Sequence, residues 1–140
     1  MTDIKGQVRD FYDQVGWQEI GTGVYQNATY EDLRPVSREY IHRCHLRVNR
    51  YLQPHGKYLL DAGSGPIQYP EYLGYSQGYQ YRVCADISAV ALQEARKRIG
   101  DRVGLFVVAQ IANVPFKPLS IDCVVWQHTF HNLPDEDQNA

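Results

Sequence analysis

The sequence has few cysteines, and their placement argues against two kinds of stabilised small domain. Three cysteines, Cys44, Cys84 and Cys123, occur in 140 residues, and no two of them form a C-x-x-C pair. An odd number of widely separated cysteines indicates neither a disulfide framework nor a zinc knuckle. We expect buried thiols in a reducing compartment, and therefore a cytoplasmic protein.

The chain also lacks a strong charge of either sign and a long hydrophobic run. Its net charge is −2, which does not indicate a basic surface for binding nucleic acid. No apolar segment reaches the ~20 residues of a transmembrane helix. Residues 1–6 contain no apolar signal region. We therefore expect neither nucleic acid nor a membrane as a partner.

Two parts of the chain differ in their patterns. Residues 1–55 carry apolar side chains at helical spacing without strand alternation, and the stronger of their predicted helices follows Pro35. From residue 56 onward, segments typical of strands and helices alternate. The predicted strands are 57–62, 81–86, 105–109 and 121–126, and the predicted helices are 67–77 and 89–99. This alternation predicts an α/β domain with a parallel sheet over 56–140, preceded by a helical segment over 1–55. The third strand is almost wholly apolar, which is typical of a buried parallel strand.

The most informative motif directly follows the first predicted strand. Asp61-Ala62-Gly63-Ser64-Gly65-Pro66 places an acidic residue before two glycines with G-x-G spacing. Small residues at a strand-to-helix turn let the backbone approach a ligand closely and take up positive φ. A site for the pyrophosphate of a dinucleotide would gain nothing from the fixed negative charge of Asp61, whereas a site for a cationic ligand would. S-adenosylmethionine, which carries a sulfonium and an ammonium and no phosphate, fits this motif.

Polar or small residues also follow the other predicted strands. Asp86 ends the second strand, 21 residues after Gly65, a spacing at which an acid holds both hydroxyls of a ribose. Gln110 and Ile111 follow the third strand, and Gln127 follows the fourth. Ligands of open parallel sheets bind outside the carboxyl ends of the strands. We therefore expect these residues to line one site.

Together these motifs resemble those of class I S-adenosylmethionine-dependent methyltransferases of the small-molecule type. Residues 59–65 resemble the glycine-rich first motif, 84–88 the ribose-binding second motif, 107–116 the third and 121–135 the fourth. The similarity covers about residues 57–137 in order and spacing. It implies a Rossmann-like methyltransferase fold with a parallel sheet of about four strands, the N-terminal half of a seven-stranded domain, preceded by helices.

The resemblance implies roles for the residues that match it. Gly63 and Gly65, with Ser64 between them, would pack under the methionine part of S-adenosylmethionine, and Asp61 would orient its ammonium. Asp86 would accept hydrogen bonds from the ribose hydroxyls. The remaining cofactor-binding residues would be Ile87, Gln110 and Ile111 at the adenine and Gln127 near the methyl-bearing end. The implied reaction transfers a methyl group to a small-molecule acceptor, and no catalytic residue is assigned.

Three features depart from the pattern of this family. Gln110 stands where the family often has an acid, and Pro66-Ile67 stands where it often has a third glycine. The chain ends at Ala140, soon after the fourth predicted strand, so we expect a shortened domain with impaired turnover. The fourth strand would then be a bare apolar edge, which predicts a homodimer that pairs through it. The alternative is a truncated or engineered folding and assembly module without catalysis.

Two other interpretations are weaker. A nicotinamide-dependent enzyme would need a glycine near position 68, where Gln68 stands, and would tolerate Asp61 poorly. His42 and His45, like His128 and His131, lie three residues apart and could each supply two metal ligands. Few carboxylates or thiols lie nearby, so we expect no metal. A base role for either histidine of the second pair stays open.

Overall fold

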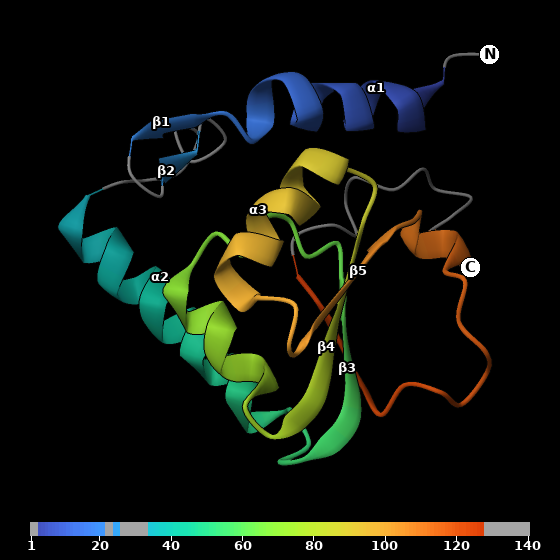
Figure 1. Cartoon of the computed structure of the whole chain (residues 1–140). Helices are drawn as coiled ribbons and strands as arrows, with labels where there is room; N and C mark the ends of the chain where they lie inside the picture. Colours follow the sequence, from blue (N-terminus) through green and yellow to red (C-terminus); the bar gives the residue numbers. More distant parts are fainter. Residues whose placement is uncertain (1–2, 22–23, 26–33, 128–140) are drawn as a thin grey trace.

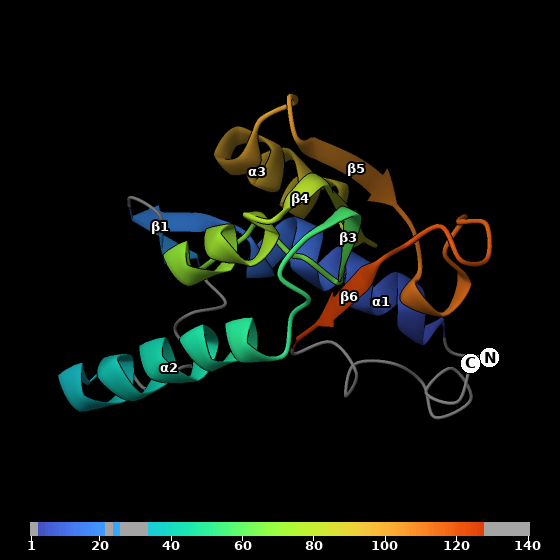
Figure 2. The same ribbon diagram turned by 90° about the horizontal axis from the view of Figure 1, so that it is seen from below.

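A computed structural model describes residues 3–21, 24–25 and 34–127 of the chain (Figure 1). Its main element is a four-stranded parallel sheet with the order β5-β4-β3-β6. The strands are β3 (Gly56–Ala62), β4 (Tyr79–Asp86), β5 (Gly104–Val108) and β6 (Cys123–Trp126). All four predicted strands therefore form, and they confirm the predicted α/β class. In Figure 2, β5 and β6 lie at opposite edges of the sheet.

Helices cover mainly one face of this sheet. They are α2 (Pro35–Arg47) with the short 3₁₀ helix η3 (Val48–Arg50), the 3₁₀ helix η4 (Pro70–Ser76) and α3 (Ala89–Ile99). Leu59 and Val125 pack there against Tyr75, while Cys84 packs against Leu92 of α3. The α3 helix begins as predicted, because the Ser88 hydroxyl accepts a hydrogen bond from the Ala91 N–H at 3.1 Å.

The opposite face of the sheet is covered differently. Leu60 and Val83 pack there against Ile111, Phe116 and Ile121, which belong to the segment between β5 and β6. That segment contains only a short 3₁₀ helix, η5 (Ile111–Asn113). No helix in the described parts of the chain is long and apolar enough to cross a membrane.

The N-terminal part lies across the carboxyl ends of the strands (Figure 1). Helix α1 (Ile4–Phe11) continues into a π-helical turn, η1 (Tyr12–Gly16). Hydrogen bonds join this part to the residues that follow the strands: the Ser88 hydroxyl donates to Asp13, and Lys5 Nζ donates to Gln110 Oε1 at 3.3 Å. The N-terminal segment therefore borders the edge of the sheet at which the predicted site residues lie.

The structure corrects the predicted helix over 67–77. An α-helix does not form there, and the shorter 3₁₀ helix begins only at Pro70. The reason is the pair of prolines, since neither Pro66 nor Pro70 has an N–H and each disfavours helical geometry in the residue before it. Tyr69 is accordingly extended, with φ −107° and ψ 140°.

Three smaller predictions are also corrected. The N-terminal 55 residues are not wholly helical, because β1 (Glu19–Gly21) and β2 (Val24–Tyr25) form an antiparallel pair. The third predicted strand, β5, is not buried: it ends the sheet, and Leu105 and Val108 are 42% and 62% exposed. Of the three free cysteines only Cys84 is buried, and the other two are half-buried.

Candidate functional site

The loop after β3 has the geometry that its glycines were predicted to provide. Gly63 and Gly65 have φ values of +70° and +54°, in the left-handed region that other residues avoid. The N–H groups of Gly63 and Ser64 both donate to the Ala85 carbonyl oxygen, at 2.7 and 3.3 Å. This pairing holds the loop against the end of the neighbouring strand β4.

Asp86 connects this glycine loop to the start of α3. Its Oδ2 accepts a hydrogen bond from the Gly65 N–H, and its Oδ1 accepts one from the Ser88 N–H, both at 2.9 Å. Burial raises the pKa of Asp86, and the bonds from Ser88 and Gly65 offset part of that rise. A carboxylate oxygen has two lone pairs, so each oxygen can accept one further hydrogen bond.

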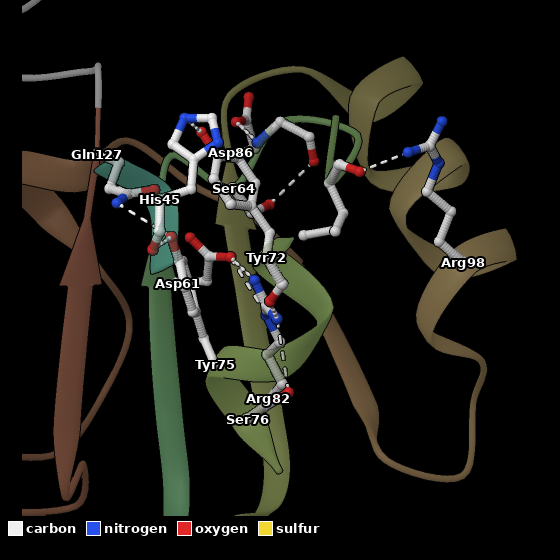
Figure 3. A network of polar contacts seen from close by, with 12 residues as sticks. His45, Asp61, Ser64, Tyr72, Tyr75, Ser76, Arg82, Asp86, Arg98 and Gln127 are labelled. Carbon is white, nitrogen blue, oxygen red and sulfur yellow. Dashed lines mark hydrogen bonds and ion pairs between the residues drawn. The ribbon is translucent and has the colours of Figure 1, made fainter. Parts of the chain in front are cut away.

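Asp61 is buried and forms an ion pair that the motif did not predict. Its Oδ2 accepts bonds from Nε and Nη2 of Arg82 on β4, at 3.2 and 2.5 Å. Arg82 is 1% exposed and also donates to the Tyr72 carbonyl oxygen and to the Ser76 hydroxyl. Burial raises the pKa of Asp61, and the Arg82 guanidinium offsets part of that rise. Oδ1 of Asp61 points away from Arg82 (Figure 3).

An open cleft of about 320 Å³ lies beside Asp86, where the adenine was expected. From the sheet side it is lined by Ile87, by Gln110 and by the end of β5. From the other side it is lined by the N-terminal segment, including Lys5 and Arg9. Ile111 does not line this cleft and instead packs against the sheet beside Leu60 and Val83. The cleft therefore combines apolar side chains, those of Ile87 and Val108, with several hydrogen-bonding groups.

Gln127 follows β6 and points toward the helical face of the sheet. Its side-chain amide donates to the Tyr75 hydroxyl at 3.4 Å, and that hydroxyl donates to the His45 carbonyl oxygen at 2.8 Å. Figure 3 shows Gln127 and Asp61 at neighbouring strand ends, with Ser64 and Asp86 on the β4 side. The structure thus brings eight of the nine predicted site residues to one edge of the sheet, and Ile111 lies beneath it.

Several residues of this edge were not predicted from the sequence. Trp17 packs on the glycine loop so closely that a Cβ on Gly65 would lie 3.2 Å from its indole. Lys5 and Arg9 come from a helix about 80 to 100 residues away in sequence, so no local pattern indicated them. Arg82 alone left a signal, because a cation inside an otherwise apolar strand needs a buried partner.

The histidines have different surroundings from those of a metal site. Among the described residues, no group of three or more His, Cys, Asp or Glu side chains is arranged to hold a metal. His42 and His45 instead share Glu71, with His45 Nδ1 at 3.5 Å from Glu71 Oε2. His128 and His131, for which a base role was left open, lie outside the described residues.

Comparison with known proteins decides the family. The methyltransferase domain family matches residues 60–140, which include the glycine loop, Asp86 and Gln127. The chain belongs to this family. The match confirms the resemblance to class I S-adenosylmethionine-dependent methyltransferases and removes the nicotinamide alternative. A search of curated proteins found no match.

Solved structures confirm the fold of this methyltransferase domain. Magnesium protoporphyrin IX methyltransferase from Synechocystis PCC 6803, with bound S-adenosylmethionine, has a TM-score of 0.66 at 18% identity, covering 99% of this chain and 68% of its own. An S-adenosylmethionine-dependent methyltransferase from Leishmania major has 0.67 at 16%, covering 96% and 52%. Geranyl diphosphate C-methyltransferase from Streptomyces coelicolor has 0.61 at 16%, covering 98% and 58%. The chain thus spans between about half and two thirds of the length of these proteins.

Proposed function

We propose that this domain binds S-adenosylmethionine across the carboxyl ends of its strands and transfers the methyl group to a small-molecule acceptor. The observation that carries the proposal is the joint position of Asp86 and the glycine loop. The Asp86 carboxylate is bonded to the Gly65 N–H and still has lone pairs for the two hydroxyls of a ribose. Membership of the methyltransferase domain family supports the same cofactor.

The residues on the β5 side fit an adenosine. The cleft beside Asp86 offers Ile87 as an apolar surface for the purine ring and the Gln110 side chain as a hydrogen-bonding group. Its volume of about 320 Å³ is at the lower end of the range for small-molecule sites, which suits a nucleoside. Lys5 already bonds to Gln110 Oε1, so the Gln110 N–H₂ donors stay available to the ring nitrogens.

The residues on the β3 and β6 side fit the amino-acid part of the cofactor. Gly63 and Ser64 would form the floor, since the glycine at positive φ keeps side chains away from the ligand. Asp61 Oδ1 would accept from the ammonium, while Oδ2 stays bonded to Arg82. Gln127 would lie near the methyl-bearing end. This side of the site is covered by Trp17, which would exclude water from the glycine loop.

The main contribution of the protein to methyl transfer would be to orient the cofactor and the acceptor. When bound, S-adenosylmethionine supplies the methyl group, and the electron pair of the broken carbon–sulfur bond stays on sulfur. Asp86 and the adenine cleft would fix one end of the ligand, and Asp61 would fix the other. Ser64 and Gly65 hold the loop between these two anchors in place. The acceptor would approach from the β6 side, because the β5 side is occupied by the adenine.

Calorimetric titration with S-adenosylhomocysteine tests this proposal. Asp86→Asn keeps the size of the side chain but replaces one acceptor oxygen by a donor, so we expect it to weaken binding at least tenfold, equivalent to about 1.4 kcal/mol. Asp122→Asn is the matched control. The Asp122 carboxylate also accepts two backbone N–H groups, from Lys57 and Tyr58 at 2.9 and 2.8 Å, but at the amino end of β3.

The two variants give a clear decision. Saturable binding by the unmodified chain that is lost in Asp86→Asn and kept in Asp122→Asn supports the proposed site. Equal weakening in both variants would mean that loss of a carboxylate acts through stability rather than through the ligand. No heat of binding from a folded chain would contradict the proposal.

A second candidate function is assembly without catalysis, through a homodimer that pairs along β6. It is favoured by the apolar outer strand: Val124 and Trp126 are 54% and 40% exposed, and β6 ends the sheet within the described residues. Light scattering after size exclusion tests it. Val124→Lys should convert a dimer to a monomer, whereas Val36→Lys, at a valine of α2 that is 69% exposed, should not. A monomer at all concentrations would exclude this candidate.

Two further proposals concern organisation and location. We propose that residues 1–55 form an N-terminal segment, whose described part is mainly helical apart from the β1–β2 pair, and that residues 56–140 form the S-adenosylmethionine-binding domain. Support comes from the main sheet, all of whose described strands lie after residue 55. The three free cysteines suit the cytoplasmic location that we propose. Limited proteolysis, with cleavage before β3 expected first, checks the proposed boundary.

A further inference from the structure

A compact group of titratable side chains lies beside Gln127. This group, the His45 cluster, consists of His45 from α2 and of Glu71 and Tyr72 from η4. The side chains of His45 and Glu71 are only 7% and 11% exposed. Buried ionisable groups are uncommon, and those at a cleft or strand edge often take part in the chemistry. The cluster is therefore a candidate for a role in methyl transfer.

The two nitrogens of the His45 ring face different partners. Nδ1 lies 3.5 Å from Glu71 Oε2, and Nε2 lies 3.3 Å from the Tyr72 hydroxyl. A carboxylate at Nδ1 favours the tautomer in which that nitrogen carries the proton. Nε2 is then an acceptor, and the Tyr72 hydroxyl donates to it. The arrangement is a chain from carboxylate to imidazole to phenol.

The charge that faces the imidazole is negative. Burial raises the pKa of Glu71, but the hydrogen bond from His42, a bond from its own backbone and the ion-pair contact with His45 together outweigh burial and lower the pKa below its usual value. Glu71 is therefore ionised near neutral pH, and its field stabilises a proton that arrives at Nε2. The other ionisable ring packed on His45 is that of Tyr69, with centroids 4.4 Å apart.

The cluster lies where the reacting end of the cofactor would point. The adenine cleft is beside β5 and Asp86 ends β4, so an extended ligand bound at both runs on toward β3 and β6. Tyr75 lies between the cluster and this end, since its hydroxyl donates to the backbone carbonyl oxygen of His45 and accepts from the Gln127 side chain. Figure 3 shows the His45 imidazole beyond the carboxyl ends of the strands, on the Gln127 side.

We propose that Glu71, His45 and Tyr72 form a proton relay that serves a hydroxyl-bearing methyl acceptor. The proposal rests on the proposed function, because it needs the methyl group directed toward β6. The half-buried Tyr72 hydroxyl takes the O–H proton of the acceptor while its own proton passes to His45 Nε2. Glu71 holds the imidazolium that results. The acceptor oxygen keeps the electron pair of its O–H bond and uses it to form the bond to the methyl carbon.

The relay narrows the class of acceptor. A carboxylate has no proton to lose at neutral pH, so a buried base would give it no advantage. A phenol or another weakly acidic hydroxyl is mostly neutral at that pH and becomes a far better nucleophile when it loses its proton. Tyr72 is the residue that would touch the acceptor, and His45 and Glu71 act through it.

Titration of the protein with 4-nitrophenol tests the relay without turnover, because only the ionised form of this phenol is yellow. The experiment is run at one pH unit below the pKa of the free probe, where about a tenth is ionised. With S-adenosylhomocysteine present, we expect bound probe to be about fivefold more ionised than free probe. His45→Gln and Tyr72→Phe should abolish the increase. His55→Gln, the same change at an exposed histidine before β3, should keep it.

Circular dichroism of each variant separates relay loss from unfolding, and Tyr72→Phe retains the ring that packs in the core. The titration is repeated without S-adenosylhomocysteine, because the relay is preformed in this chain. A signal that depends on His45 and Tyr72 supports the relay even if calorimetry shows no cofactor binding and the proposed function fails. No increase under either condition, or an increase that survives both substitutions in folded protein, overturns the relay.

Discussion

The buried pair between Asp61 and Arg82 gives a quantitative prediction about stability. Arg82→Met removes the guanidinium, which is 1% exposed, and leaves the Asp61 carboxylate buried without its partner. Loss of one member of a buried ion pair costs about 3–5 kcal/mol. Asp61→Asn leaves the opposite charge uncompensated, but Arg82 keeps its bonds to Tyr72 and Ser76, so we expect the lower end of that range.

The double variant Arg82→Met/Asp61→Asn separates pair energy from desolvation. It contains no buried charge, so its main cost is an amide with unsatisfied hydrogen bonds, about 1–3 kcal/mol. The two single costs together exceed that by about 3 kcal/mol or more, which is a large coupling energy for two contacting residues. Urea unfolding followed by circular dichroism measures all four free energies of unfolding. Additive costs, with a coupling energy below about 0.5 kcal/mol, would refute the paired geometry.

Three further predictions concern Ile67, Ser88 and Asp122. Ile67 is fully buried and has φ +58°, a conformation that strains a β-branched residue by about 1–3 kcal/mol. In urea unfolding, the free energy of unfolding of Ile67→Gly should therefore exceed that of Ile67→Ala by about 1 kcal/mol, the reverse of the usual order. Ser88→Ala should destabilise the domain by about 1–2 kcal/mol in thermal melting, because the hydroxyl caps α3 and also contacts Asp13. Backbone hydrogen bonds from Tyr58 and Lys57 lower the pKa of Asp122 in the folded protein. The contribution of Asp122 to stability is therefore present above the unfolded pKa of about 3.9 and is lost as the pH falls through the folded pKa. Asp122→Asn should flatten that part of the acid unfolding curve.

Much of the fold could be predicted because the apolar pattern of the strands is strong. The runs at 57–62 and 81–86 have acids at or next to their ends, Asp61 and Asp86, and turn residues follow each, so both strands and their polar ends were evident. Ser88 and Gly100 likewise marked the ends of α3. The helix over 67–77 was the main error, because the two prolines around Ile67 outweigh an apolar pattern that does resemble a helix.

The environment of the site residues was less predictable than their identity. Asp61 and Asp86 lie at the predicted strand ends, and the place of Arg82 in an apolar strand indicated a buried partner, but not that this partner is Asp61. The burial of β5 was also misjudged, because an apolar run does not reveal that a strand lies at the sheet edge. Trp17 covers Gly65 through a contact between residues far apart in sequence, which requires the tertiary fold.

Chemical-shift mapping with S-adenosylhomocysteine tests the central claim most directly. In ¹H–¹⁵N spectra of the labelled chain, the account predicts saturable shifts of the amides of Gly63, Gly65, Ile87, Gln110 and Gln127, at the carboxyl ends of the four strands. Amides at the opposite end of the sheet, such as those of Lys57 and Tyr58, should stay in place. Shifts confined to other surfaces, or no shifts from a folded chain, would contradict the proposed cofactor site.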